Sequence, residues 1–194
     1  MNQIALASTS PRRRSLLESL GFELTLLKPD IDESEKPGEN PEELVLRLAR
    51  EKVQAVASQT KLPLIAADTL VVLGDEILGK PDNAEHAYEM IEKLSGRSHD
   101  VLSGFAVAYQ DKLINKVVKS TLVFRKLFKH EIEDYVKTRE WEGKSGACTL
   151  QGASGPFVDH MTGSFTNVLG LPLTEVLEAL RLVTPTGFEP VFTA

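Results

Sequence analysis

The sequence predicts an α/β fold built around a mixed, twisted central sheet that is flanked by helices. Apolar segments typical of strands alternate along the chain with segments that have helical periodicity. Two long apolar segments, 101–109 and 113–124, are separated only by Gln110, Asp111 and Lys112, which favours an antiparallel hairpin. The other strands are separated by helices, as in crossover connections, so the sheet is expected to contain both parallel and antiparallel pairs.

In the N-terminal half, strands are predicted from short apolar segments and helices from apolar residues spaced three to four apart. Glycine, serine and proline mark the ends of these segments, as Gly21 does for the first helix. The expected elements are a strand at 4–7, a helix from Pro11 to Gly21, a strand at 22–27, a helix at 42–58, a strand at 62–73 and a helix at 84–94.

In the C-terminal half, the hairpin is followed by a predicted helix at 129–137 and by a loop at 143–155 that is rich in glycine and small polar residues. A closing helix is predicted at 173–182. We therefore assign residues 1–183 to one domain and residues 184–194, which contain two prolines and no periodicity, to a poorly ordered tail.

Composition narrows the class of protein. The net charge of −6 over 194 residues argues against nucleic-acid binding, which needs a broad basic surface. No segment approaches the roughly 20 apolar residues that span a membrane, and the N-terminus lacks the basic leader of a secretory signal. The single cysteine excludes an internal disulfide and fits a reducing compartment. We therefore expect a cytoplasmic protein.

The segment from Ser8 to Arg14 is the strongest local signal for a binding site. Ser10 can cap the helix that follows, and Pro11 suits its first position. Three consecutive arginines then lie in the first turn, where the helix dipole disfavours cations. A multivalent anion such as phosphate resolves this conflict, because it binds both backbone amides and guanidinium groups. The alternative is a solvated basic turn whose arginines pair with nearby glutamates.

Asp68 is the second signal, because it interrupts an otherwise apolar strand. An unpaired buried carboxylate is destabilised by several kcal/mol, so this side chain is expected to be ion-paired, bound to a metal or facing a cleft. The alternative is an aspartate that caps its own backbone at a bend. Three further charged residues, Glu33, Lys52 and Lys80, resemble solvated surface charges when each is taken alone.

Histidine and cysteine give no comparable signal. The histidines at positions 86, 99, 130 and 160 lack the spacing of metal ligands, and we expect them on the surface or in hydrogen bonds. Cys148 has little basic surrounding and is expected to be a buried, inert thiol.

Taken together, the segments resemble the Maf-type nucleotide pyrophosphatases, a family related to the inosine triphosphate pyrophosphatases. The matching stretches cover nearly all of residues 2–180 and are ALASTSPRRR, LRLAREKV, AADTLV, LGKPDNAEHAYEMIEKLSGRSHDV, FRKLFKHEIEDYV, GKSGACTLQG and NVLGLPL. The resemblance implies an elongated, two-lobed single domain with a cleft. It also implies hydrolysis of dTTP and UTP to monophosphate and pyrophosphate, and it implies homodimers.

The resemblance also assigns roles to individual residues. It implies that Asp68 is the catalytic acceptor and a metal ligand, and we expect Glu33 to share a divalent cation, Mg²⁺ or Mn²⁺, with it. It assigns triphosphate binding to Ser8, Arg13, Lys52 and Lys80, and base selection to Arg12, Thr69 and Gln151.

One stretch departs from the family pattern. After Lys144 the chain reads SGACTLQG, whereas the family's usual stretch is close to AGAYGIQG, so the residues expected around the base differ. Two alternative functions use the same anion site. A regulatory protein would bind nucleotide without needing Asp68, and a phosphomonoesterase or phosphotransferase would release orthophosphate or transfer it.

Overall fold

The computed structural model of the protein describes residues 2–185. Its strands are β1 (Gln3–Ala7), β2 (Glu23–Leu27), β3 (Leu64–Leu73), β4 (Glu76–Leu78), β5 (Ser98–Tyr109), β6 (Lys112–Phe124) and β7 (Val158–Thr162). Its helices are α1 (Pro11–Glu18), α2 (Pro41–Val56), α3 (Ala84–Leu94), α4 (Lys129–Lys137), α5 (Phe165–Val168) and α6 (Leu173–Val183). Short 3-10 helices are η1 (Ala57–Gln59), η2 (Ser145–Ala147) and η3 (Gly155–Phe157).

The strands form one seven-stranded mixed sheet in the order β2-β1-β3-β5-β6-β7, with β4 paired to β3. The pairs β1–β2 and β1–β3 are parallel, whereas the remaining pairs are antiparallel. The predicted hairpin is present, with Tyr109 opposite Lys112 and a positive φ of 54° at Gln110 in the turn. The predicted mixed sheet with flanking helices is thus confirmed.

Three short elements were not predicted, namely β4, β7 and α5. The five residues of β7, VDHMT, are half-buried or exposed and carry no apolar pattern, so the segment does not stand out as a strand. Most of the poorly ordered tail predicted for 184–194 lies outside the described residues. Within residues 2–185, no helix is long and apolar enough to cross a membrane.

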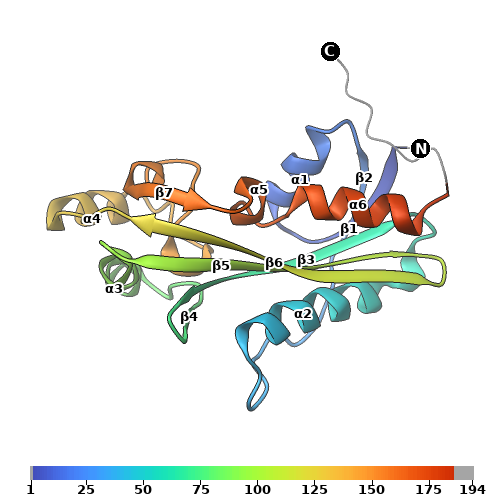
Figure 1. The fold of residues 1–194 in the computed structure, drawn as a ribbon, viewed down its shortest axis with the longest axis horizontal. Helices are drawn as coiled ribbons and strands as arrows, with labels where there is room; N and C mark the ends of the chain where they lie inside the picture. Colours follow the sequence, from blue (N-terminus) through green and yellow to red (C-terminus); the bar gives the residue numbers. More distant parts are fainter. Residues whose placement is uncertain (1, 186–194) are drawn as a thin grey trace.

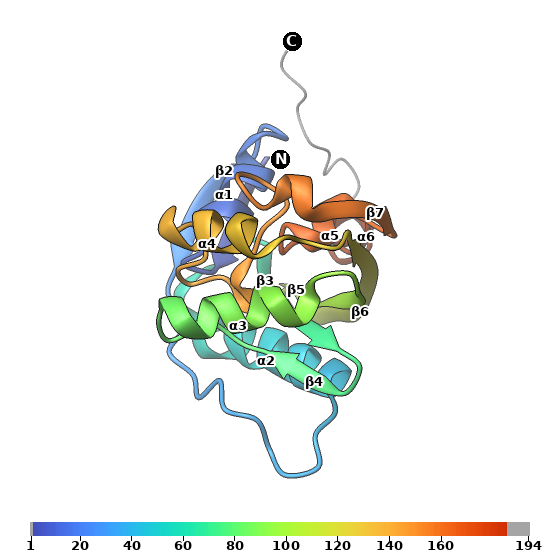
Figure 2. The ribbon, with the colours of Figure 1, turned by 90° about the vertical axis from the view of Figure 1, so that its left-hand side faces the viewer.

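The molecule is elongated because β3, β5 and β6 run through both of its ends (Figure 1). Figure 2, which looks along the long axis, shows α2 on one side of the sheet and α1 and α6 on the other. We call the end built by β1, β2, α1 and α6 the α1–α6 lobe. The opposite end, built by α3, α4, β7, η2 and η3, is the α3–α4 lobe.

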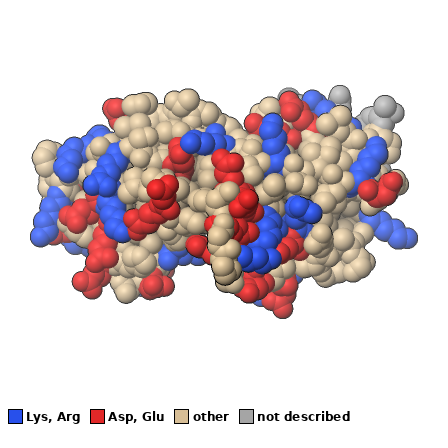
Figure 3. Space-filling view, turned by 60° about the horizontal axis from the view of Figure 1, so that its bottom comes forward, with Lys and Arg blue, Asp and Glu red and all other residues tan. Residues whose placement is uncertain are grey.

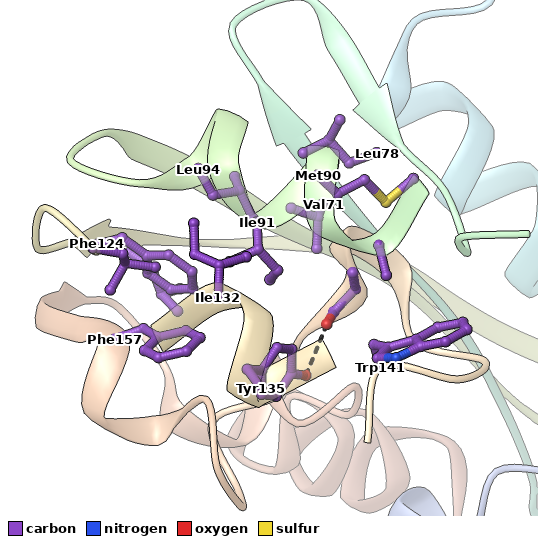
Figure 4. Packing of buried hydrophobic residues seen from close by; sticks show 14 of the residues in the cluster. Val71, Leu78, Met90, Ile91, Leu94, Phe124, Ile132, Tyr135, Trp141 and Phe157 are labelled. Carbon is purple, nitrogen blue, oxygen red and sulfur yellow. Dashed lines mark hydrogen bonds between the residues drawn. The ribbon is translucent and has the colours of Figure 1, made fainter. Parts of the chain in front are cut away.

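Each lobe has its own hydrophobic core, which confirms the two-lobed architecture. The core of the α1–α6 lobe includes Ile4, Leu6, Leu17, Ile65, Phe105, Leu171 and Leu180. The core of the α3–α4 lobe, drawn in Figure 4, includes Val71, Ile91, Leu94, Phe124, Ile132, Tyr135, Trp141 and Phe157. Tyr135 donates a hydrogen bond of 2.8 Å to the carbonyl of Ala147, which ties α4 to η2 within the same lobe.

Helix α2 packs close to the sheet. It begins with a capping box between Asn40 and Glu43, and its buried side lies on small residues of β1, β3 and β5 such as Ala66 and Ala106. At Gly104 of β5, an added Cβ would lie 2.2 Å from the carbonyl oxygen of Val45. Glycine and alanine in the sheet therefore set the distance between α2 and β3, on which the candidate site depends.

We predict that Gly104→Ala lowers the free energy of unfolding by roughly 2 kcal/mol or more, because the methyl group has to push the α2 backbone away. Urea denaturation measures the loss. Gly79→Ala is the matched control, since nothing lies within 4 Å of a Cβ at that position. Equal stability of the two variants would contradict the close packing of α2.

Candidate active site

The candidate site lies where β3 continues past the end of β1. Strand β1 pairs with β3 only at Leu64 and Ile65, and β4 pairs with β3 from Val71 onward. Between these points, residues 66–70 have no neighbouring strand on that edge within the described part of the chain. A cavity of about 480 Å³ opens there, and residues of both lobes line it.

Asp68 lies on this unpaired stretch and forms the centre of a charged triad. The ammonium of Lys52, from α2, lies 2.5 Å from Asp68 Oδ1 and 2.6 Å from Glu33 Oε1. The Lys52 side chain is only 8% exposed, whereas that of Glu33 is 50% exposed. Burial alone would raise the pKa of Glu33, but the bond to Lys52 and the charges of Lys80 and Arg13 lower it below its usual value.

Arg13, from α1, contacts Thr69, the residue that follows Asp68 in β3. Successive side chains of a strand alternate between its faces, so Thr69 and Asp68 point to opposite sides of β3. Arg13 Nε donates to the carbonyl of Gly170 (2.7 Å), and its terminal nitrogens donate to Thr69 Oγ1 (3.1 Å) and Ser8 Oγ (3.4 Å). Burial lowers the pKa of Arg13, an effect that the charge of Asp68 opposes. The guanidinium is therefore fixed at the cavity wall by Ser8, Thr69 and Gly170.

The predicted cap of α1 is confirmed. Ser10 accepts a hydrogen bond from the amide of Arg13 at 3.5 Å, and Pro11 occupies the first turn. Ser8 Oγ accepts from the amide of Ser10 at 3.1 Å, which tightens the turn after β1. The start of the helix thus faces the cavity, with Ser8, Thr9 and Ser10 among the lining residues.

Positive charge dominates the cavity. Six lysine and arginine side chains line it, at positions 12, 13, 28, 52, 80 and 144, against the two carboxylates of Glu33 and Asp68. Sequence reasoning missed Lys28 and Lys144, which stand alone at the ends of loops and carry no local pattern. Burial lowers the pKa of Lys144, and the neighbouring charge of Arg12 lowers it further. Such an excess of cations in a partly enclosed space favours a multivalent anion.

The charge excess is local to the cavity. On the face shown in Figure 3, Lys and Arg side chains are interspersed with Asp and Glu side chains, and no broad basic surface is seen there.

Eight of the nine predicted site residues line the cavity, namely Ser8, Arg12, Arg13, Glu33, Lys52, Asp68, Thr69 and Lys80. Gln151 is exposed and is not among the lining residues, although Thr149 and Leu150 are. The hydroxyl of Thr69 contacts Arg13 and also lies 2.8 Å from Ser103 Oγ. Thr69 is therefore engaged by protein groups on the cavity wall.

His99 lies inside the protein rather than on the surface. Its side chain is 3% exposed and lines the cavity, and its Nδ1 has no hydrogen-bond partner among the described residues. Burial lowers the pKa of His99 to about 4, although the Arg97 backbone and the charge of Asp100 act in the other direction. The ring is therefore neutral near pH 7.

Cys148 also lines the cavity and is half-buried. Burial raises the pKa of its thiol to about 12, so the side chain stays protonated and unreactive. The raised pKa agrees with the predicted inert thiol, but the side chain is half-buried rather than buried.

The donor set limits how a metal is bound. No group of three or more His, Cys, Asp or Glu side chains suited to a metal occurs within residues 2–185. Glu33 and Asp68 are two carboxylates beside a cationic cavity, which suits Mg²⁺, an ion that commonly takes one or two carboxylates together with waters and substrate phosphates. The residues present therefore fit a cation that arrives with a phosphorylated ligand.

Arg47 of α2 anchors the loop that carries Glu33. Its guanidinium contacts both carboxylate oxygens of Glu39 at 2.6 and 2.8 Å and donates to the carbonyl of Ser34 at 2.9 Å. A further bond of 2.9 Å joins it to Glu51. Ser34 is the residue after Glu33, so these bonds of Arg47 hold the backbone next to Glu33 in place.

Comparison with known proteins gives consistent results. A family model described as Maf-like protein matches residues 3–183. A dTTP/UTP pyrophosphatase of Escherichia coli is 43% identical over 182 residues, which are 93% of this chain and 92% of that protein. One of Anaeromyxobacter dehalogenans is 45% identical over 183 residues, covering 92% and 93%. A HAM1 protein structure from Coxiella burnetii aligns with a TM-score of 0.50 at 17% identity, covering 92% and 99%, and this likeness concerns the fold alone.

We predict that Glu39→Gln loosens the loop and removes an acid-sensitive part of the stability. The hydrogen bond from Arg47 lowers the pKa of Glu39 from 4.5 to about 2. This contribution is present above pH 4.5 and is lost as the pH falls towards 2, because the unfolded chain takes up the proton first. After allowance for solvent screening it amounts to roughly 1 kcal/mol.

Urea denaturation between pH 7 and pH 3 measures this, and amide hydrogen exchange follows the loop. The free energy of unfolding of Glu39→Gln should fall less steeply with acid than that of the wild type, and residues 33–38 should exchange faster. Glu42→Gln, at an exposed position of the same helix, is the control. Unchanged exchange in the loop would show that Arg47 does not hold it.

Proposed function

The chain belongs to the Maf-like protein family, and on this premise we propose that it hydrolyses nucleoside triphosphates to a nucleoside monophosphate and pyrophosphate. We propose dTTP and UTP as the preferred substrates, together with modified pyrimidine nucleotides, because both relatives carry the name dTTP/UTP pyrophosphatase. The observation that carries the proposal is Asp68, a carboxylate in the wall of a cavity that six cationic side chains also line.

In this proposal the triphosphate binds at the end of the cavity that holds Arg13. The bonds of Arg13 to Gly170, Ser8 and Thr69 leave its remaining N–H groups for phosphate oxygens. Ser8 and the free amides at the start of α1 add neutral donors, as helix N-termini do for other phosphates. Lys52 and Lys80, both near Glu33, neutralise the rest of the charge.

Asp68 is proposed as the general base. It accepts a proton from a water that attacks the α-phosphorus, and the bond from that phosphorus to the bridging oxygen breaks to release pyrophosphate. General-base catalysis of this kind contributes about 10²–10⁴-fold to a rate. Glu33 and Asp68 would hold a divalent cation, Mg²⁺ or Mn²⁺, which supplies charge neutralisation at the phosphates and a more acidic water.

Lys52 has a double role in this scheme. Without ligand its ammonium joins Glu33 and Asp68, which keeps two neighbouring carboxylates in place despite their mutual repulsion. When phosphate oxygens enter, the same ammonium can share its N–H donors with them, because Nζ has three. The arrangement supports binding of an anion beside the two carboxylates.

The resemblance assigns base selection to Arg12, Thr69 and Gln151. Because the hydroxyl of Thr69 accepts a bond from Arg13, we propose that Thr69 acts by holding Arg13 in place. The roles of Arg12 and Gln151 stay predictions. We also propose that the protein is a homodimer, as the resemblance implies, and that it is cytoplasmic. Its ligand in this proposal is a small nucleotide, and it binds neither nucleic acid nor a membrane.

Two other functions would use the same anion site. A regulatory protein that binds nucleotide without hydrolysing it would not need a general base such as Asp68 beside the cationic side chains. A phosphomonoesterase would release orthophosphate instead of pyrophosphate. The names of the two relatives favour the pyrophosphatase over both.

We predict that Asp68→Asn lowers kcat for dTTP and UTP by about 10²–10⁴-fold, because the amide is not basic at neutral pH. Binding of a non-hydrolysable UTP analogue should change by less than about threefold, since Lys52 keeps Glu33 as a partner. Product analysis in the presence of Mg²⁺ separates pyrophosphate from orthophosphate.

Asp75→Asn is the matched control, because Asp75 is exposed in the turn that follows the same strand. It should behave as the wild type. The proposal would fail if Asp68→Asn kept most of the activity, or if the wild type released orthophosphate directly from the triphosphate.

A further inference from the structure

The two ends of the cavity differ in chemistry. Arg13, Lys52 and Asp68 lie at one end, whereas the wall towards the α3–α4 lobe contains a patch of apolar side chains, with Lys144, Ser145 and Thr149 also lining this side. We call this second part the apolar end, and its wall includes Val71, Val101, Leu122, Phe124, Val158 and Val168. The contiguous apolar side chains of this part of the cavity suit an uncharged, planar group.

The apolar end lies at a suitable distance from the phosphate-binding end. On β5, Ser103 and His99 point to the same face, because they are four residues apart. Ser103 Oγ lies 2.8 Å from the hydroxyl of Thr69, which accepts a bond from Arg13. At about 3.4 Å per residue, His99 lies about 14 Å along the strand from the level of Arg13. An extended nucleoside triphosphate spans such a distance.

His99 carries an unsatisfied hydrogen-bonding atom in this apolar wall. The side chain is 3% exposed, and its Nδ1 finds no partner within residues 2–185. The ring packs edge-on against Phe124, with centroids 4.7 Å apart and an interplanar angle of 89°. Buried polar groups in folded proteins are nearly always paired, so an unpaired one in a cavity wall points to a missing ligand.

Thr149 provides a second atom of the same kind. Its Oγ1 is buried without a partner among the described residues, and Thr149 also lines the cavity. A hydroxyl can donate or accept a hydrogen bond, whereas a neutral imidazole nitrogen without a proton accepts one. The low pKa of His99, about 4, keeps the ring neutral at physiological pH.

We propose that the apolar end of the cavity holds the nucleobase and that His99 Nδ1 accepts a hydrogen bond from the N3–H of uracil or thymine. The hydroxyl of Thr149 donates to a carbonyl beside that N3–H. Cytosine presents a lone pair at N3, which faces the lone pair of His99 and is disfavoured. This inference rests on the proposed function, and it adds His99 and Thr149 to the residues expected to select the base.

The test compares His99→Leu with His99→Asn, using UTP, CTP and N3-methyl-UTP as substrates. Leucine keeps the apolar contacts and removes the acceptor, so kcat/KM for UTP should fall about 10- to 100-fold while that for CTP changes by less than threefold. Asparagine can place its Oδ1 near the position of Nδ1 and should keep the UTP to CTP ratio within about threefold. His160→Leu, at an exposed histidine of β7, is the control.

Wild-type protein provides a readout that does not depend on folding of a variant. It should favour UTP over N3-methyl-UTP by at least tenfold, and His99→Leu should lose that preference. Equal losses for UTP and CTP in His99→Leu, or equal use of UTP and N3-methyl-UTP by the wild type, would overturn the inference while leaving pyrophosphatase activity intact.

If the wild type hydrolysed no triphosphate, the proposed function would fail on its own. The inference is then decided by ligand-induced thermal stabilisation with non-hydrolysable analogues of UTP and CTP. A larger shift for the UTP analogue that disappears in His99→Leu supports the inference, and equal shifts for the two analogues overturn it.

Discussion

The bridge that Lys52 forms between Glu33 and Asp68 is the interaction on which the site depends. It joins a loop, a helix and a strand that are distant in the sequence, and it exists only because α2 packs against a sheet surface made of alanine and glycine. A larger residue at Gly104 would move the α2 backbone outward at Val45 and separate the ammonium from Asp68. The ion pairs of Lys52 therefore depend on the close packing of α2 against the sheet.

Elements with strong local patterns could be predicted from the sequence. The helices at 84–94 and 129–137 have the predicted bounds, and the cap at Ser10 follows from the order of hydroxyl, proline and arginine residues. The isolated carboxylate of Asp68 marked the cavity because burial of a charge requires a partner. In each case the physical cause lies within a few residues of the signal.

Features that depend on distant parts of the chain could not be predicted. His99 is the second residue of β5 and lies in a polar stretch, and its surroundings come from Phe124 and from segments much later in the sequence. The contact between Thr69 and Arg13 joins residues 56 positions apart. Gln151 was assigned from the resemblance alone, and the turn around it leaves the side chain exposed. Tertiary packing, rather than local propensity, decides all three.

In the part of the chain that the structure describes, residues 66–70 of β3 leave one edge of the strand unpaired between β1 and β4, and an added strand could pair with this edge. Unpaired strand edges readily recruit another strand, and an N-terminal strand only a few residues longer would have continued the ladder along 66–70. The sheet would gain regular hydrogen bonds, and the cavity would be filled by main chain. Because β1 ends at Ala7 and the chain turns away at Ser8, the edge of β3 at residues 66–70 stays open. The protein has to keep this edge unpaired in order to have a site.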